Sequence, residues 1–379
     1  MDAIVTTALV HSHEWARFDY GSEHPLRMER LALTWRLMEA YGLTRLPDAR
    51  LAVPDLAGED AIARYHTQEY LDVLKASDSG QAPAIACRYG LGPGDNPVFP
   101  GIWEAARLSA GGSLLGARLI ADGQVTHAFH FAGGLHHAMR DRASGFCYVN
   151  DAVLAILFLR SRGLRVAYVD IDAHHGDGVQ HAFYDDPNVL TISTHERGDR
   201  LFPGTGFVEE TGEGEGVGYS VNLPLDVLTT SGIYLPAFEA VVPPLVTKFR
   251  PDVVVAQLGI DSHRTDPLTH LALDVQGFGR AFARILTLAP RVLALGGGGY
   301  DLENVARAWT LAWALINDVE LSAELPPIFL DQASWFRFRS LSLWDPPAPP
   351  DKERCLHARE YVERQVDAIR RLIFPIHDL

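Results

Sequence analysis

Short apolar runs alternate with stretches of helical periodicity along the 379-residue chain. Runs rich in β-branched and other apolar residues predict strands at residues 4–10, 126–131, 166–171, 189–194, 253–258 and 291–295. Several of these runs are almost continuously apolar, as expected for strands that are covered on both faces. Helical stripes are formed by Val305, Trp309, Ala312 and Ile316, and by Val362, Val366, Ile369 and Ile373. The alternation predicts an α/β fold in which a mainly parallel sheet carries helices on both sides.

The length of the chain alone allows one large α/β domain or two smaller ones. We expect one domain over residues 1–379. The proline-rich segment 345–350 is the best candidate for a linker. It leads into a C-terminal helix at about residues 351–374, which we expect to pack on the body of the domain. Segments 90–100 and 210–218 are rich in glycine and are expected to be surface loops.

Clusters of polar residues and glycines follow four of the predicted strands. They occupy residues 133–137, 170–178, 259–261 and 296–300. Parallel α/β sheets bind their ligands beyond the carboxyl ends of the strands. The four loops can therefore converge on one site, although the strand order cannot be read from the sequence.

The richest cluster is Tyr-Val-Asp-Ile-Asp-Ala-His-His-Gly-Asp-Gly at residues 168–178. In an extended strand, alternate side chains share a face, which would group Asp170, Asp172 and His174. Mixed carboxylate and imidazole ligands suit Zn²⁺ or Fe²⁺, and the spacing fails the calcium-loop pattern. A catalytic zinc needs three protein ligands, and Asp261 at the end of another strand is the natural third. The alternatives are a polar loop after the strand and, for Asp261, a helix cap or turn residue.

The tandem pair His136–His137 is best interpreted as general acid/base groups near this metal. Each imidazole needs a carboxylate to fix its tautomer, and Asp170 and Asp177 are available. Tyr300 follows four glycines, and its phenol could donate a hydrogen bond to a developing oxyanion. These glycines do not fit a phosphate-binding motif. The alternative for Tyr300 is an aromatic residue of the core.

Phe146 and Phe202 lie in segments that contain glycine or proline, and both could be core residues. The surrounding residues favour loops, where an aromatic side chain is available to a ligand. Two such rings facing each other would form a narrow apolar slot for an aliphatic chain.

Composition narrows the functional classes. The formal net charge is −15, which argues against a general nucleic-acid-binding protein. The three cysteines lie far apart and predict neither a disulfide framework nor a cysteine metal site, so we expect a reducing, cytoplasmic environment. The apolar N-terminus has no basic leader and is interpreted as a strand instead of a signal peptide. No uncharged apolar run approaches the roughly 18 residues of a membrane span.

Eight segments of the chain resemble sequence motifs of the zinc-dependent histone deacetylase superfamily. The resemblance is to its bacterial class I-like members of the acetoin-utilisation deacetylase type. The segments are residues 24–30, 65–70, 133–137, 145–151, 170–178, 202–206, 257–261 and 296–300. They follow the order of the family from about residue 20 to residue 316. The resemblance implies a single arginase/deacetylase-like α/β domain with a mainly parallel sheet of about eight strands. It also implies a metal-dependent amidohydrolase that removes acetyl groups from N-acetyl-lysine in proteins or peptides through a metal-activated water.

The resemblance assigns roles to individual residues. Asp172, His174 and Asp261 look like the ligands of Zn²⁺, for which Fe²⁺ or Co²⁺ could substitute. His137 looks like the general base and acid, His136 like its electrostatic companion, and Tyr300 like the tyrosine that polarises the carbonyl. The carboxylates behind the two histidines would be Asp170 for His136 and Asp177 for His137.

Further positions match the substrate and potassium sites of the family. The implied acyl-lysine tunnel and its rim comprise Gly145, Phe146, Phe202, Leu268 and Asp95. The implied inner K⁺ site comprises Asp170, Asp172, His174, Ser193 and Thr194. The implied outer K⁺ site comprises Phe183, Asp186, Val189 and Tyr219, mostly through main-chain oxygens.

Some features depart from the family pattern or leave alternatives open. The rim loop has Gly94 and Asn96 around its single aspartate, and Ile260 stands where alanine is common. The same catalytic set would also serve an acetylpolyamine deacetylase or an enzyme for longer acyl-lysines, although no long insertion precedes Asp95. A non-catalytic acyl-lysine reader would lack a ligand or the tyrosine, and an arginase-like hydrolase would need a two-metal set. The expected partner is an acylated lysine or a small acetylated amine.

Overall fold

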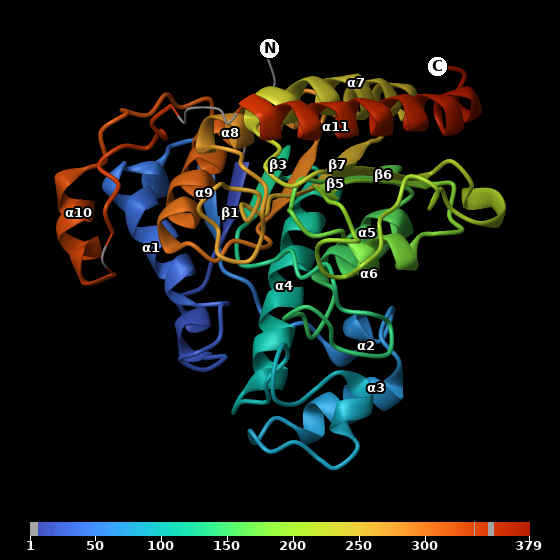
Figure 1. The fold of residues 1–379 in the computed structure, drawn as a ribbon. Coiled ribbons are helices and arrows are strands. Elements are labelled where there is room, and N and C mark those ends of the chain that lie inside the picture. Colours follow the sequence, from blue (N-terminus) through green and yellow to red (C-terminus); the bar gives the residue numbers. More distant parts are fainter. Residues whose placement is uncertain (1–6, 337, 348–351) are drawn as a thin grey trace.

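The apolar runs of the sequence form the strands of one parallel sheet in the computed structural model, which describes residues 7–336, 338–347 and 352–379 (Figure 1). The eight strands are β1 (Thr7–Val10), β2 (Ala49–Ala52), β3 (His127–His130), β4 (Val166–Asp170), β5 (Val189–Glu196), β6 (Ser220–Leu225), β7 (Val253–Gln257) and β8 (Val292–Leu295). Their order is β2-β1-β3-β8-β7-β4-β5-β6, and every neighbouring pair is parallel. The predicted α/β class and strand number are confirmed.

All six strands predicted from apolar runs are present, although residues 4–6 of the first lie outside the described residues. Sequence patterning missed the two edge strands. In β2 the central residues Arg50 and Leu51 are exposed, so no buried run marks the strand. In β6 the sequence carries Asn222 and Pro224, and proline is tolerated there because an edge strand has one unpaired side.

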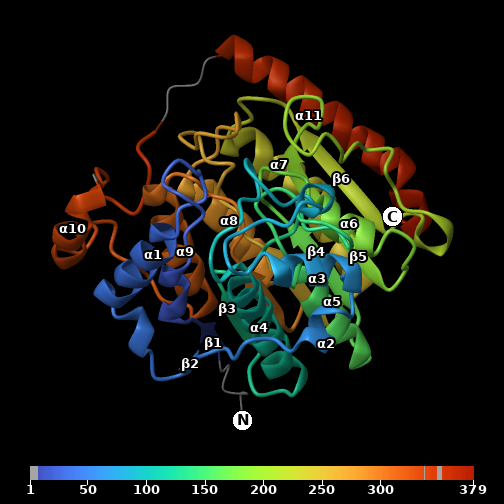
Figure 2. The same ribbon diagram turned by 90° about the horizontal axis from the view of Figure 1, so that it is seen from below.

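Helices cover both faces of the sheet. They are α1 (Glu29–Ala40), α2 (Glu59–Ile62), α3 (Gln68–Ala76), α4 (Ile102–Ala121), α5 (Asp151–Ser161), α6 (Asp177–Ala182), α7 (Ser231–Phe249), α8 (Val275–Leu286), α9 (Leu302–Ile316), α10 (Pro327–Ala333) and α11 (Lys352–Leu372). Helices α4 and α5 lie on one side, and α7, α8 and α9 lie on the other (Figure 2). The helical stripes predicted around residues 305–316 and 362–373 correspond to α9 and α11.

Side-chain caps fix where the helices near the candidate site begin. The Asn150 side chain accepts a hydrogen bond from the Val153 N–H at the start of α5. Asp301 accepts one from the Glu303 N–H at the start of α9. Such caps satisfy backbone donors that a helix terminus leaves free. The cap at Asp301 therefore sets the point at which the chain leaves the glycine loop.

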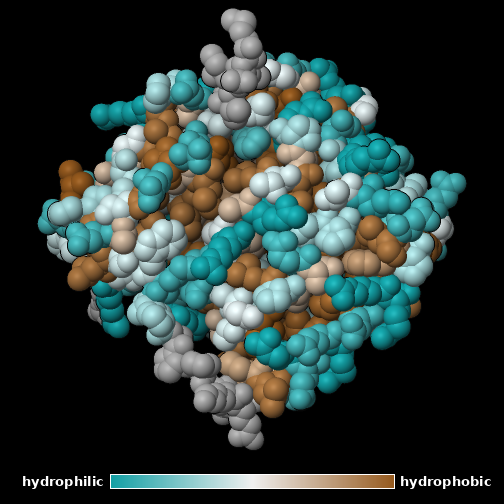
Figure 3. All heavy atoms as spheres, turned by 90° about the horizontal axis from the view of Figure 1, so that it is seen from above, coloured by the Kyte–Doolittle hydropathy of each residue, from teal (hydrophilic) through white to brown (hydrophobic). Residues whose placement is uncertain are grey.

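The C-terminal helix α11 packs against α7 and β6. The face formed by these helices shows hydrophobic patches between bands of polar residues (Figure 3). The first residue of the predicted linker, Asp345, is part of the packed domain instead of a free linker. Its side chain is buried and hydrogen-bonded to the Arg307 guanidinium at 2.9 Å and to the Val275 N–H at 2.8 Å. Residues 348–350 of that segment lie outside the described residues. Within the described part of the chain, no helix is both long and apolar enough to cross a membrane.

The strand order explains how the four polar loops meet. Strands β3, β8, β7 and β4 are consecutive neighbours in the middle of the sheet, and β5 is next to β4. Because all of these strands are parallel, the segments that follow them emerge at the same edge. The tandem histidines, the glycine loop, Asp261 and the acid-rich segment thus reach one place.

Candidate active site

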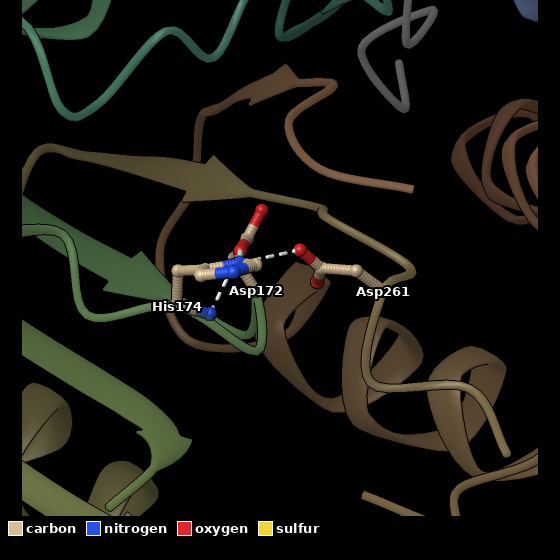
Figure 4. A group of neighbouring side chains, drawn as sticks. All are labelled: Asp172, His174 and Asp261. Atoms are coloured by element: carbon tan, nitrogen blue, oxygen red, sulfur yellow. Dashed lines mark hydrogen bonds and ion pairs between the residues drawn. The ribbon is translucent and has the colours of Figure 1, made fainter. Parts of the chain in front are cut away.

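Three side chains from two neighbouring strand ends converge as a candidate metal site. Asp172 and His174 follow β4, and Asp261 follows β7 (Figure 4). One potential ligand atom from each lies within 4.8 Å of the others, and all three residues are buried. The His174 Nδ1 atom lies 2.8 Å from Asp261 Oδ2 and 3.3 Å from Asp172 Oδ1. One imidazole and two carboxylates form a ligand set typical of catalytic divalent metals.

The sequence argument assumed that strand alternation brings these side chains together, but the structure achieves the convergence in another way. Strand β4 ends at Asp170, and the next residues form a turn. Within this turn the Asp172 N–H donates to Asp170 Oδ1 at 3.0 Å, and the His174 N–H donates to Asp172 Oδ1 at 2.9 Å. Aspartate side chains favour such local bonds to the backbone two residues on. The turn directs Asp170 toward His136, while Asp172 and His174 point toward Asp261.

The charge balance of the three groups fits a cation. Two buried carboxylates face a single imidazole, and buried charges need partners. Burial and the charge of Asp172 raise the pKa of Asp261 to about 6. Burial alone would lower the pKa of His174, but the two carboxylates raise it well above its ordinary value. Without a metal, protons must compensate the excess negative charge, and a divalent cation would take over that role.

Two imidazole–carboxylate pairs lie beside this triad. His136 Nδ1 is 2.9 Å from Asp170 Oδ2, and His137 Nδ1 is 2.7 Å from Asp177 Oδ1. The Nε2 atoms of the two imidazoles are 3.0 Å apart. The ring centroids of His137 and His174 are 5.7 Å apart. Each imidazole of the tandem pair thus has a carboxylate of its own within hydrogen-bonding distance.

The pKa values of the two histidines are shifted in opposite directions. Burial alone would lower the pKa of His136, but the carboxylates of Asp170 and Asp172 raise it to about 9. Burial and the positive charge of His136 lower the pKa of His137 to about 4, against the effect of Asp177. At neutral pH one imidazole is thus charged and the other can accept a proton. A bound cation would lower the pKa of both imidazoles, because it adds positive charge nearby.

The glycine loop after β8 lies directly against the two carboxylates. The Gly298 N–H donates to Asp172 Oδ2 at 2.6 Å. A Cβ atom on Gly298 would lie 2.1 Å from Asp261 Oδ2, so only glycine fits there. The loop ends at Tyr300, whose ring centroid is 6.4 Å from that of His174. The glycines thus permit the close backbone approach that brings the phenol to the site.

Aromatic side chains surround the approach to the triad. The Phe202 ring is 5.1 Å from the His137 ring and 43% of the residue is exposed. The Phe146 ring packs edge to face on Tyr300 at 5.7 Å. Phe146 follows Gly145 and has a φ of 68°, a conformation uncommon for a large side chain and frequent at functional sites. A Cβ atom on Gly145 would lie 2.5 Å from the His137 ring.

The predicted rim residues lie around the same aromatic side chains. The Asp95 side chain is exposed, and its carbonyl oxygen is 3.2 Å from His24 Nε2. The His24 ring in turn contacts Phe146 at 4.5 Å. Leu268 is half-buried, and its N–H donates to Asp266. Asp266 also accepts the Tyr300 N–H, which places Leu268 near the tyrosine.

The residues matched to potassium sites lie behind the triad. For the inner set, the Thr194 hydroxyl donates to the Asp170 carbonyl at 3.1 Å, and Ser193 pairs with Asp170 across β4 and β5. For the outer set, the Asp186 N–H donates to the Phe183 carbonyl and the Val189 N–H to the Asp186 carbonyl. The Tyr219 carbonyl accepts the Thr191 N–H.

Three residues support the site and were given no role from the sequence. The buried Arg30 donates to the Gly297 and Gly299 carbonyls at 2.8 and 3.1 Å and thereby holds the glycine loop. Asp266 accepts the Tyr300 N–H at 2.8 Å. Asp151 accepts the N–H groups of residues 134 and 135, just before the tandem histidines. Arg30 and Asp151 lie inside segments quoted for the family resemblance, which was the available signal.

Comparisons with known proteins agree with this geometry. The family profile of the histone deacetylase domain matches residues 24–316. The acetoin utilization protein AcuC of Bacillus subtilis is 37% identical over 384 residues, covering 98% of this chain and 97% of that protein. Histone deacetylase 8 of Xenopus tropicalis is 40% identical and covers 86% of this chain and 88% of its own.

Solved structures show the same fold. The crystal structure of a histone deacetylase homologue complexed with SAHA has a TM-score of 0.87 at 30% identity, covering 96% of this chain and 99% of its own. A histone deacetylase homologue from Aquifex aeolicus has a TM-score of 0.86 at 31% identity, with the same coverage. The sequence matches and the shared fold agree along most of the chain. The protein is therefore a member of the histone deacetylase family, of the AcuC type.

Proposed function

We propose that the protein is a zinc-dependent deacetylase that hydrolyses N-acetyl-lysine in proteins or peptides. The observation that carries the proposal is the convergence of Asp172, His174 and Asp261 beside the tandem histidines. Several relatives are named histone deacetylases, and every residue of the proposed catalytic set is present in this chain. Acetylpolyamines and longer acyl-lysines are the competing substrates, because they need the same catalytic groups.

Asp172, His174 and Asp261 would hold the metal, with Fe²⁺ or Co²⁺ as possible substitutes for Zn²⁺. The bound ion supplies a Lewis acid for the carbonyl and lowers the pKa of the attacking water. The Gly298 N–H and the Ala173 N–H hold the outer oxygens of the two carboxylates. These bonds keep the ligand oxygens oriented toward His174.

His137 is the proposed general base. Its Nδ1 atom carries a proton that is directed to Asp177, which leaves a lone pair at Nε2. That nitrogen takes a proton from the attacking water, while the water oxygen bonds to the acetyl carbon. His136 stabilises the negative charge that develops, and Asp170 orients its imidazole. When the carbon–nitrogen bond breaks, the proton on His137 passes to the lysine nitrogen, and acetate and a free amine are released.

Tyr300 is the proposed donor to the oxyanion. Burial and the nearby carboxylates raise the pKa of its phenol well above 10, so the hydroxyl keeps its proton at neutral pH. A protonated phenol can donate a hydrogen bond at the moment when the carbonyl oxygen becomes negative. Arg30 and Asp266 support this position through the peptide group that joins Gly299 to Tyr300, because Arg30 donates to the Gly299 carbonyl and Asp266 accepts the Tyr300 N–H.

The aliphatic part of the acyl-lysine would lie between Phe146 and Phe202, with Gly145 and Leu268 beside it. The exposed carboxylate of Asp95 would accept hydrogen bonds from the substrate backbone at the rim. Two K⁺ ions would bind at the inner and outer oxygen sets described above. The inner ion would adjust the charge around Asp170 and thus around His136.

Metal content and turnover of variants test the proposal. Replacing Asp172 or Asp261 by Ala should abolish bound metal and acetate release together, whereas Asp185→Ala, at an exposed carboxylate, should change neither. Tyr300→Phe should retain metal but lower kcat by about 10²–10³-fold, because one oxyanion donor is lost. Tyr361→Phe on α11 is its matched control. An active Asp172→Ala variant without metal would refute the ligand assignment, and unchanged turnover of Tyr300→Phe would refute its role.

A further inference from the structure

The loop that carries Phe202 is held from behind by one carboxylate. Glu210 Oε1 accepts the N–H groups of Gly206 at 2.8 Å and Phe207 at 3.0 Å. Its other oxygen, Oε2, accepts a hydrogen bond from Gln180 Nε2 at 2.7 Å. Glu210 therefore connects the backbone of the Phe202 loop to α6. Bonds to a charged acceptor are stronger than bonds between neutral groups.

Both the nitrogen and the oxygen of the Gln180 side-chain amide form hydrogen bonds. While its nitrogen donates to Glu210, its oxygen accepts from His175 Nε2 at 3.1 Å, Ser220 Oγ at 2.8 Å and Asn222 Nδ2 at 2.7 Å. The opposite orientation of the amide would point its NH₂ group at these three donors. The direction of the Gln180–Glu210 bond is thus fixed by the surroundings.

This network connects to the proposed general base His137 and to the candidate metal ligand His174. Gln180 lies on α6, which begins at Asp177, the partner of His137. His175 follows the candidate ligand His174, and its Nδ1 atom lies 2.8 Å from the Thr205 hydroxyl on the Phe202 loop. The same bonds therefore fix the loop relative to the general base and to the metal ligands.

The two aromatic side chains of this loop have little apolar packing, whereas Val208 after them is buried in the core. Phe202 and Phe207 are 43% and 39% exposed. A cavity of about 490 Å³ lies against the network, and Gln180 and Thr205 are among its lining residues. The opposite wall differs, because the Phe146 ring contacts both His24 and Tyr300. Phe146 is held by these rings and by a hydrogen bond from the Tyr20 hydroxyl to its carbonyl, whereas the exposed Phe202 side chain depends more on the polar bonds that hold its loop.

We propose that the Gln180–Glu210 pair positions Phe202 and thereby sets the length of acyl chain that the site accepts. This inference rests on the proposed function, in which Phe202 is a wall of the acyl-lysine slot. With the pair intact, the Phe202 ring stays 5.1 Å from the ring of the proposed base His137, so it borders the space for the acyl group as well as the slot for the lysine side chain. When the pair is broken, the loop gains freedom and the slot admits longer chains. Gln180 and Glu210 are positioning residues, since neither touches the reacting atoms.

A charge-neutral exchange of the two residues tests the inference. Glu210→Gln places an amide donor against the donor of Gln180, and Gln180→Glu places two carboxylates together. The double variant Gln180→Glu/Glu210→Gln restores one donor and one acceptor at every contact. Glu209→Gln, at the exposed neighbouring residue, removes the same charge without touching the network. Four variants thus separate the effect of the bond from the effect of charge.

Two readouts are expected to move together. Hydrogen exchange of the peptide that covers residues 201–210 should become about tenfold faster in each single variant, because repulsion between positions 180 and 210 displaces the side chain that accepts from the Gly206 and Phe207 amides. The ratio of kcat/KM for longer acyl-lysine over acetyl-lysine peptides should rise about fivefold or more, a size expected for methylene discrimination in an apolar slot. The double variant should return both readouts to within about twofold of wild type. Glu209→Gln should match wild type.

An unchanged hydrogen-exchange rate in Glu210→Gln would overturn the inference. So would a double variant that fails to restore the behaviour of the wild-type protein. A shift of equal size in Glu209→Gln would overturn it as well, because charge alone would then explain the effect. If the wild-type protein hydrolyses no acyl-lysine peptide, the proposed function fails. In that case the exchange data still decide whether the pair holds the loop, so the two failures are distinguishable.

Discussion

Replacing Asp177 by Asn isolates the role of the carboxylate behind the proposed base. The two side chains have the same shape, and the perturbation removes a charge that lies 2.7 Å from His137 Nδ1. The Asp177 side chain is only 10% exposed, so water cannot replace the lost interaction fully. A hydrogen bond to a charged group is worth about 1.5–3 kcal/mol, which corresponds to about 10–150-fold in rate.

The tautomer of His137 adds to this loss. An asparagine at position 177 can present its amide nitrogen to His137 Nδ1, which would move the imidazole proton to Nε2. The nitrogen that faces the substrate would then be unable to accept a proton, and losses of about 10⁴-fold are known for such tautomer errors. We therefore expect kcat to fall by about 10²–10⁴-fold, with a much smaller change in KM.

The assay is steady-state acetate release from an acetyl-lysine peptide, with metal content and thermal unfolding measured on the same preparations. Asp185→Asn is the matched control, because it removes an exposed carboxylate from the same region of the chain. A kcat of Asp177→Asn within about threefold of wild type, at full metal content, would refute the reasoning that Asp177 fixes the proton on His137.

Two further substitutions probe the support of the site. Gly298→Ala would bring a Cβ atom 2.1 Å from Asp261 Oδ2, so metal affinity should fall by about 10–100-fold in a competition titration; wild-type affinity would show that the loop can shift. Asp345→Ala should lower the free energy of unfolding by about 3 kcal/mol in urea, because Arg307 loses its buried partner; a loss below about 0.5 kcal/mol would contradict this. Although burial opposes it, hydrogen bonding to His263 lowers the pKa of Asp345, so its contribution should be present at neutral pH and decline as the pH falls below about 4.

The sequence allowed the centre of the fold to be predicted because its strands are buried on both faces. β4 and β7 are fully buried, and a buried strand in a parallel sheet requires a continuous apolar run. The edge strands could not be found in this way. β2 is largely exposed, and β6 contains Pro224, which is compatible with a strand only when one side needs no backbone donor.

The candidate ligands were predictable as residue types, but not the mechanism of their convergence. Asp172 and His174 meet Asp261 because β4 and β7 are neighbours, and strand order is a property of the tertiary fold. The turn after Asp170 depends on local side-chain bonds that strand alternation does not describe.

Contacts between distant segments were beyond sequence reasoning. Gln180 and Glu210 are separated by 30 positions, and neither belongs to an apolar or helical pattern that marks a contact. Asp345 was assigned to a linker because prolines follow it, yet its carboxylate is bonded to Arg307 on α9. A single chain carries no signal for such pairings, since each partner is an ordinary surface residue type when considered alone.

The central claim is that this site hydrolyses acetyl-lysine, and a substrate panel tests it most directly. The zinc-loaded protein would be assayed against acetyl-lysine peptides, matched longer acyl-lysine peptides and acetylpolyamines under one set of conditions. The account predicts the highest kcat/KM for the acetyl-lysine peptides, because the slot proposed between Phe146 and Phe202 would suit one extended side chain with a small acyl group. A preference for acetylpolyamines of more than about tenfold in kcat/KM would contradict it.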